Sequence, residues 1–136
     1  MRQLREDVAI ILNEREPLKR ELAARAVEQF EKNRICAVRI EPGLDLVETL
    51  RRRAPRVVVL DYLLGDMGTA IDVLDELTEP EVILWTDEPS LSVAVQAMKA
   101  GARDYIDSAR PSSVERMLES VCDLLRQRVP AVRGDE

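Results

Sequence analysis

Residues 56–66 read R-V-V-V-L-D-Y-L-L-G-D, an apolar run that ends in a carboxylate. The residues from Val57 to Leu60 are apolar on both faces and rich in valine, which predicts a central strand of a parallel sheet covered by helices on each side. Asp61 follows directly, where the chain leaves the sheet. Ligands of open parallel α/β sheets bind outside the carboxyl ends of the strands, so Asp61 is a candidate metal ligand or nucleophile.

Strand-like and helix-like runs alternate along the rest of the chain. Strands are predicted at 8–12, 35–40, 57–60, 82–86 and 105–106, and helices at 17–33, 44–55, 69–77, 90–100 and from 112 or 113 onward. Pro17 suits the first turn of the first helix. The apolar stripe predicted for that helix consists of Leu18, Leu22, Ala26 and Phe30. Five strands alternating with five helices predict a doubly wound α/β fold, with one parallel sheet between two helical layers.

Composition narrows the class of protein. With 136 residues, 46% of them apolar, the chain predicts one globular domain at 1–128 and a flexible tail at 129–136. A formal net charge of −6 opposes phosphate-backbone binding, so no direct nucleic-acid partner is expected. No apolar run approaches the length of a bilayer span, which predicts a cytoplasmic protein without a membrane partner. The chain contains no histidine, which excludes catalysis by histidine, metal binding by histidine and a phosphohistidine within it.

The strand-to-helix loops of the predicted fold meet at one edge of the sheet. They carry Asn13 and Glu14 after the first strand, Asp61 after the third and Thr86 after the fourth. The carboxylates of Glu14 and Asp61 would repel each other unless a cation lay between them, and oxygen ligands of this kind suit Mg²⁺. The Thr86 hydroxyl adds a donor for an anionic ligand. The residues therefore predict an acidic Mg²⁺ pocket with one exposed carboxylate available for phosphoryl chemistry.

These loops and strands resemble the receiver domains of two-component response regulators. The matching segments are L-N-E at 12–14, V-V-V-L-D-Y-L-L at 57–64, I-L-W-T at 83–86 and G-A-R-D-Y-I-D-S-A-R-P at 101–111. The resemblance extends over about residues 8–125. It implies a flavodoxin-like sheet with strand order 2-1-3-4-5 and five helices in three layers. It also implies a signalling domain rather than an enzyme.

The resemblance further implies a role for each matching residue. Asp61 matches the phosphoacceptor that attacks a phosphohistidine or a small phosphodonor, and a nucleophile of this kind needs a metal to screen the phosphoryl charge. Glu14, Asp61 and the main-chain carbonyl of Leu63 match the Mg²⁺ ligands, with Asn13 contributing through water. The positions that match the phosphoryl-binding hydroxyl and the switch aromatic are Thr86 and Tyr105.

Two departures from the family pattern affect the expected chemistry. The family usually has two acidic residues after the first strand. Here one is Asn13 and the other is the longer Glu14, so the affinity for Mg²⁺ is expected to fall. Ser108 stands where the family has a lysine that pairs with the aspartate, and serine cannot supply that charge. Arg110 is a candidate substitute, although its planar guanidinium is not equivalent to an ammonium.

Two interpretations stay open at this point. In the first, a sensor histidine kinase or phosphotransfer protein phosphorylates Asp61 with impaired kinetics, and the Thr86 loop and Tyr105 respond. In the second, an atypical receiver binds its partners without phosphorylation, as a plain interaction module would. Both imply a downstream protein target. The apolar fourth helix, which contains Val95 and Met98, adds the hypothesis of a homodimer through the fourth helix, fifth strand and fifth helix.

Overall fold

The computed structural model describes residues 6–88 and 90–128. The elements in chain order are β1 (Val8–Ile11), α1 (Pro17–Lys32), β2 (Ala37–Arg39), α2 (Leu46–Arg53), β3 (Val57–Leu60), the 3₁₀ helix η1 (Gly65–Met67), α3 (Ala70–Leu74), β4 (Glu81–Thr86), α4 (Leu91–Lys99), β5 (Asp104–Asp107) and α5 (Ser113–Arg128). The strands form one parallel sheet in the order β2-β1-β3-β4-β5. The predicted doubly wound fold and its strand order are confirmed. The tail expected at 129–136 lies outside the described residues.

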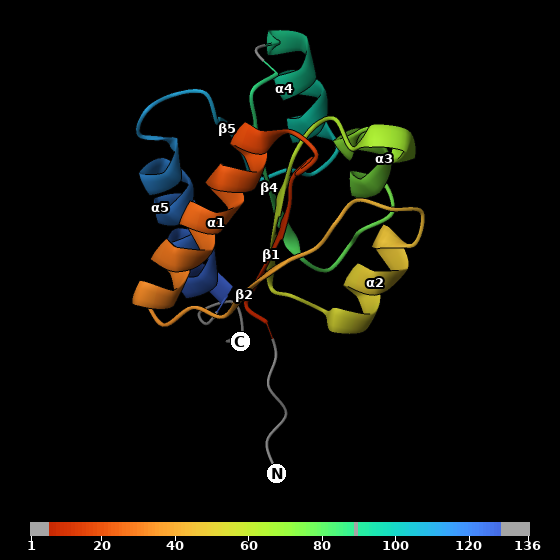
Figure 1. Ribbon diagram of the computed structural model, residues 1–136. Helices are drawn as coiled ribbons and strands as arrows, with labels where there is room; N and C mark the ends of the chain where they lie inside the picture. The colour runs from red at the N-terminus through yellow and green to blue at the C-terminus, as the bar shows by residue number, and fades with distance from the viewer. Residues whose placement is uncertain (1–5, 89, 129–136) are drawn as a thin grey trace.

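Helices cover both faces of the sheet, with α1 and α5 on one side and α2, α3 and α4 on the other (Figure 1). Successive residues of β3 alternate between two cores, because side chains of a strand point to opposite faces. Val57 and Val59 belong to the core under α1 and α5, whereas Val58 and Leu60 belong to the core on the other face. All four are fully buried, which explains why this strand has no polar alternation.

The same alternation positions Asp61. It follows Leu60 and continues the phase of Val57 and Val59, so its side chain leaves the sheet on the α1 face. Its main-chain N–H donates to the Ile11 carbonyl at 2.8 Å, which holds the end of β3 beside the end of β1. Because the strands are parallel, the loops after β1, β3 and β4 meet around this residue.

Helix α1 begins with Pro17 at its first position, where the missing N–H breaks no helical hydrogen bond. The stripe predicted from the sequence is wrong in the first turn, because Leu18 is 74% exposed. The buried residues of the helix are Lys19, Ala23, Ala26 and Phe30. Their spacing follows one helical face, so the side that packs on the sheet begins with a lysine.

The other helices start close to the predicted positions and differ in length. Helix α2 begins at Leu46, and Leu44 stays outside it and is 94% exposed. Helix α3 ends at Leu74 and does not extend to residue 77. Ser90 caps α4 as predicted, since its hydroxyl accepts from the Val93 N–H at 3.2 Å. Within residues 6–88 and 90–128, no helix has the length and apolar character needed to cross a membrane.

Candidate functional site

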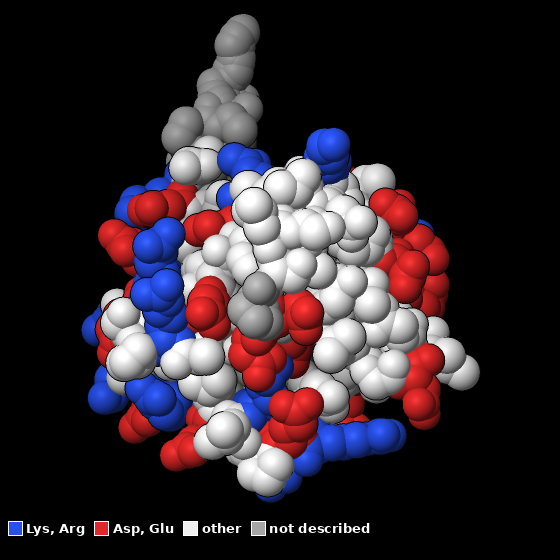
Figure 2. Space-filling view, turned by 90° about the horizontal axis from the view of Figure 1, so that it is seen from above, with Lys and Arg blue, Asp and Glu red and all other residues white. Residues whose placement is uncertain are grey.

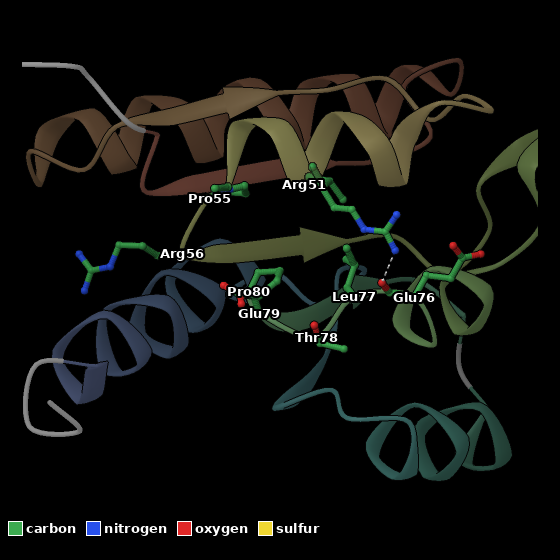
Figure 3. Close-up of a pocket in the computed structure, with 10 residues that line it drawn as sticks. Arg51, Pro55, Arg56, Glu76, Leu77, Thr78, Glu79 and Pro80 are labelled. Atoms are coloured by element: carbon green, nitrogen blue, oxygen red, sulfur yellow. Dashed lines mark hydrogen bonds between the residues drawn. The ribbon is translucent and has the colours of Figure 1, made fainter. Parts of the chain in front are cut away.

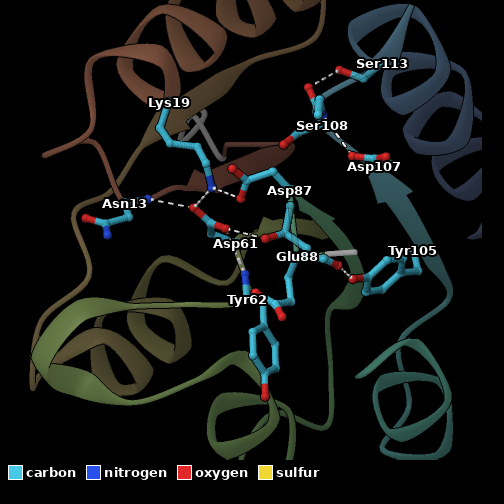
Figure 4. Close-up of polar contacts among 12 residues, drawn as sticks. Asn13, Lys19, Asp61, Tyr62, Asp87, Glu88, Tyr105, Asp107, Ser108 and Ser113 are labelled. Atoms are coloured by element: carbon cyan, nitrogen blue, oxygen red, sulfur yellow. Dashed lines mark hydrogen bonds and ion pairs between the residues drawn. The ribbon is translucent and has the colours of Figure 1, made fainter. Parts of the chain in front are cut away.

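The Asp61 carboxylate lies at the carboxyl edge of the sheet with only 1% of the residue exposed. Its Oδ1 accepts from the Thr86 hydroxyl at 2.7 Å and from the Tyr62 N–H at 2.9 Å. Its Oδ2 accepts from the Asn13 N–H at 3.0 Å and from the Lys19 ammonium at 2.6 Å (Figure 4). The expectation of an exposed carboxylate is therefore wrong, because the surrounding loops and α1 enclose it.

Lys19 reaches this carboxylate from the first turn of α1. The residue is 5% exposed, and its ammonium also pairs with Asp87 Oδ1 at 3.2 Å. Burial by itself lowers the pKa of Lys19, but the hydrogen bond and charge of Asp61, helped by Asp87, raise that pKa above its ordinary value. The ammonium therefore stays charged, and two carboxylates share a cation that the chain itself supplies.

Sequence reasoning missed both Lys19 and Asp87. The spacing of residues in α1 could have revealed Lys19. It precedes Ala23 by four residues and Ala26 by seven, which places it on the same buried face of the helix. A lysine on a buried face needs an anionic partner. The first turn of α1 follows β1 and so lies at the sheet edge where Asp61 was expected. These two facts together would have pointed to the ion pair.

In the structure, the predicted Mg²⁺ ligands do not converge on one point, and each makes contacts of its own. The Glu14 carboxylate pairs with Arg39 at the end of β2, whose Nε lies 3.1 Å from Oε2 and whose Nη2 contacts Oε1. Asn13 gives Asp61 its main-chain N–H, while its side chain extends away from the carboxylate in Figure 4. Leu63 forms a bridge with Thr69 across the following loop. Of the predicted ligand set, Asp61 and the Asn13 main chain are in direct contact, and the Glu14 carboxylate is occupied elsewhere.

This donor set does not fit a divalent cation as it is arranged. Four hydrogen bonds take up the lone-pair positions of the Asp61 carboxylate, and one of their donors is a positively charged ammonium. Among the described residues, no group of three or more His, Cys, Asp and Glu side chains is placed to hold a metal ion. The Mg²⁺ site inferred from the sequence stays a prediction, and the ion would have to displace Lys19 to reach Asp61.

The two predicted switch residues lie on either side of the β4–α4 loop. Thr86 ends β4, is 1% exposed and donates to Asp61. Tyr105, on β5, donates its hydroxyl to the main-chain carbonyl of Glu88 in that loop. Burial raises the pKa of the Tyr105 hydroxyl above its ordinary value, so the phenol stays a donor. A rearrangement of the loop at Glu88 would therefore break or move the contact with Tyr105.

Ser108 and Arg110 bring no charge to Asp61. The Ser108 N–H donates to the Thr86 carbonyl at 2.9 Å, and its carbonyl accepts from the Ser113 hydroxyl at 3.2 Å. The Ser108 hydroxyl itself is buried and has no hydrogen-bond partner. Arg110 is exposed and pairs with Asp107, with 3.7 Å between Nε and Oδ2. The cation beside Asp61 comes from α1 instead of from the loop after β5.

Two surface pockets lie at opposite edges of the sheet. One, of about 510 Å³, adjoins the site and is bordered by Asn13, Glu14 and residues 64–67. The other, of about 400 Å³, lies before β3 and β4, where Arg51 donates to the Glu76 carbonyl at 3.1 Å (Figure 3). Figure 2 shows acidic side chains near the middle of the face it presents, beside a broad area without charged side chains. The pocket in Figure 3 is too remote to take part in chemistry at Asp61.

No family model matches the chain, but individual proteins do. It is 35% identical over 89 residues to the regulatory protein LuxO of Vibrio cholerae, a match that covers 62% of this chain and 19% of LuxO. It is 29% identical over 124 residues to the probable transcriptional regulatory protein TcrX of Mycobacterium tuberculosis, covering 88% of this chain and 50% of TcrX. The chain therefore spans only a part of the length of each of these relatives.

A solved structure matches over nearly the whole chain. The crystal structure of the signal receiver domain of a putative LuxO repressor protein from Vibrio parahaemolyticus shares a TM-score of 0.79 and 26% identity, and the match covers 96% of this chain and 99% of that domain. The sheet order, the strand-end Asp61 and the Thr86 beside it agree with the resemblance seen in the sequence. Sequence and structure together show that the chain has the fold of response-regulator receiver domains and is similar in sequence to response regulators.

Proposed function

We propose that this receiver domain works as a signalling module in which Asp61 accepts a phosphoryl group and the Thr86–Tyr105 region passes the change to a protein partner. The contact that supports this most directly is the Thr86 hydroxyl at 2.7 Å from Asp61 Oδ1, with both residues buried. Phosphorylation would add nearly two negative charges at this carboxylate. The Thr86 contact, and the loop that Tyr105 holds, would then have to rearrange.

The transfer would join an Asp61 carboxylate oxygen to phosphorus. The bond between phosphorus and the donor's leaving group would break, and the leaving group would keep the electron pair. The chain has no histidine, so a phosphohistidine donor has to come from a sensor histidine kinase or a phosphotransfer protein.

We expect this transfer to be impaired. The Asp61 carboxylate is almost completely enclosed, and its four acceptor positions already receive donors. It must release at least one donor before an oxygen can attack phosphorus. Release of Lys19 would leave Asp61 and Asp87 without their shared cation, which raises the barrier. Ser108 offers no charge to compensate.

The alternative function is association with a partner without phosphorylation. The Lys19 contact favours it, because an Asp61 already paired with a cation holds the site together in the unmodified protein. Helix α4 leaves three apolar side chains exposed, and these are Leu91, Val95 and Met98. A downstream protein target, or a second copy through α4, β5 and α5, would bind this side of the domain. A concentration series in the analytical ultracentrifuge that shows a strict monomer would contradict the second-copy version.

The two functions differ in whether Asp61 becomes modified. We would incubate the protein with Mg²⁺ and acetyl phosphate and record the intact mass, and repeat the incubation with beryllofluoride under NMR. Asp61→Asn is the test variant, and Asp66→Asn, which changes an exposed carboxylate in η1, is the matched control. An adduct that disappears only in Asp61→Asn supports the phosphoacceptor. No adduct, with partner binding unchanged in Asp61→Asn, supports association without phosphorylation.

A further inference from the structure

We propose that Lys19 is an internal counter-ion that takes the place of a divalent metal ion, so that the Asp61 cluster assembles without metal. The inference rests on the proposed function for the identity of the site. It concerns how the site is held together and does not require that Asp61 be phosphorylated. A divalent ion and the Lys19 ammonium then exclude each other from this position.

The first argument is the burial and reach of the side chain. The chain contains three lysines, Lys19, Lys32 and Lys99, and the last two are exposed. Lys19 alone among them is buried, with its ammonium 2.6 Å from Asp61 and 3.2 Å from Asp87. A lysine is placed in this way only when its charge is compensated by anionic partners.

The second argument is the position of Lys19 in its helix. It lies in the first turn of α1, where the positive end of the helix dipole disfavours a cation. The two carboxylates offset this effect and make the position favourable for the Lys19 ammonium. Figure 4 shows the Lys19 side chain extending from α1 toward Asp61 and Asp87, which come from the ends of two neighbouring parallel strands.

The third argument is charge. Asp61 and Asp87 follow β3 and β4 and both contact the Lys19 ammonium, and two carboxylates that share a site repel each other unless a cation lies between them. Lys19 supplies one positive charge. Glu14, a further carboxylate that the sequence predicted as a Mg²⁺ ligand, is paired with Arg39. A divalent ion would therefore have to displace the ammonium to bind these two carboxylates.

Removal of the Lys19 charge should reverse this situation. In Lys19→Met the stem of the side chain is kept while the ammonium is lost, so Asp61 and Asp87 face each other without a cation. These two carboxylates, with water, form a ligand set that suits Mg²⁺. Lys32→Met, at the far end of the same helix, is the matched control.

The test is a Mg²⁺ titration of the folded protein, followed by amide NMR shifts of Asn13, Asp61 and Thr86 and by thermal melting. We expect wild type and Lys32→Met to show no response in either measurement. Without metal, Lys19→Met should melt at a lower temperature than wild type, and saturating Mg²⁺ should raise its melting temperature again. The double variant Lys19→Met/Asp61→Asn should show no such rise with Mg²⁺. A wild-type response equal to that of Lys19→Met would overturn the inference, and so would a folded Lys19→Met that ignores Mg²⁺.

A second measurement decides the matter if Lys19→Met does not fold. Reductive methylation of the wild-type protein in metal-free buffer should modify Lys32 and Lys99 at least about tenfold faster than Lys19, because Lys19 must leave its partners before it reacts. Equal rates at the three lysines would overturn the inference. The outcome is separate from the proposed function, since an adduct on Asp61 can form or fail to form in either case.

Discussion

Replacement of Lys19 by methionine should destabilise the protein by about 3 kcal/mol. Removal of one partner of a buried ion pair costs roughly 3–5 kcal/mol, because it leaves the other charge buried without compensation. We choose the low end because Asp61 keeps three other donors, from Asn13, Tyr62 and Thr86. The Asp87 contact adds less than about 1 kcal/mol, since the Asp87 side chain is 54% exposed and screened by water.

The assay is urea unfolding followed by fluorescence and circular dichroism. Trp85 is the only tryptophan and is fully buried, so its emission reports loss of the core under α1 and α5. For a domain of this size, a loss of 3 kcal/mol corresponds to a fall in melting temperature of roughly 10 °C. Lys19→Met/Asp61→Asn should lose less than the sum of the single variants, because the two side chains interact directly. A Lys19→Met protein within about 0.5 kcal/mol of wild type would refute the reasoning.

Three further predictions concern the neighbours of this pair. Thr86→Val keeps the shape of the side chain but removes the hydroxyl donor to Asp61, and we expect a loss of about 1.5–3 kcal/mol in urea unfolding; an unchanged stability would show that the bond contributes nothing. Ser108→Ala removes a buried hydroxyl without a partner, so stability should stay within about 1 kcal/mol of wild type or rise, and a larger loss would reveal a contact we have not seen. Because the pKa of Tyr105 is raised in the folded state, its stabilisation is complete below its ordinary value of 10.0 and is lost as the pH rises through the folded pKa. Tyr105→Phe should remove that alkaline loss in unfolding curves measured over pH, with tyrosinate absorbance as the check; curves that fall with pH as steeply as those of wild type would contradict the assignment.

The sheet could be predicted from the sequence because its strands have an unambiguous pattern. The run from Val57 to Leu60 is buried on both faces, and parallel strands fix where Asp61 emerges. The approach of Thr86 to Asp61 was likewise predictable, since β3 and β4 are neighbours and end at the same edge. These features depend on main-chain geometry, which can be predicted from the pattern of apolar residues in the strands.

The partners of the charged side chains could not be predicted in the same way. Apolar spacing placed Leu18 on the buried stripe of α1, but the structure buries the next residue, Lys19, instead. Glu14 was assigned to Asp61 because their loops are adjacent, but Arg39 at the end of β2 offers it a direct ion pair. A long flexible side chain can reach several oppositely charged neighbours, and the spacing of residues in the sequence does not show which of them it pairs with.

The central claim is that the Lys19 ammonium is a buried, charged partner of Asp61. The most direct measurement is NMR detection of lysine ammonium groups in metal-free buffer at neutral pH, where exposed ammonium protons exchange rapidly with water. We expect one slowly exchanging ammonium signal in wild type that is absent from Lys19→Met and retained in Lys32→Met and Lys99→Met. Equally rapid exchange at all three lysines would contradict the claim.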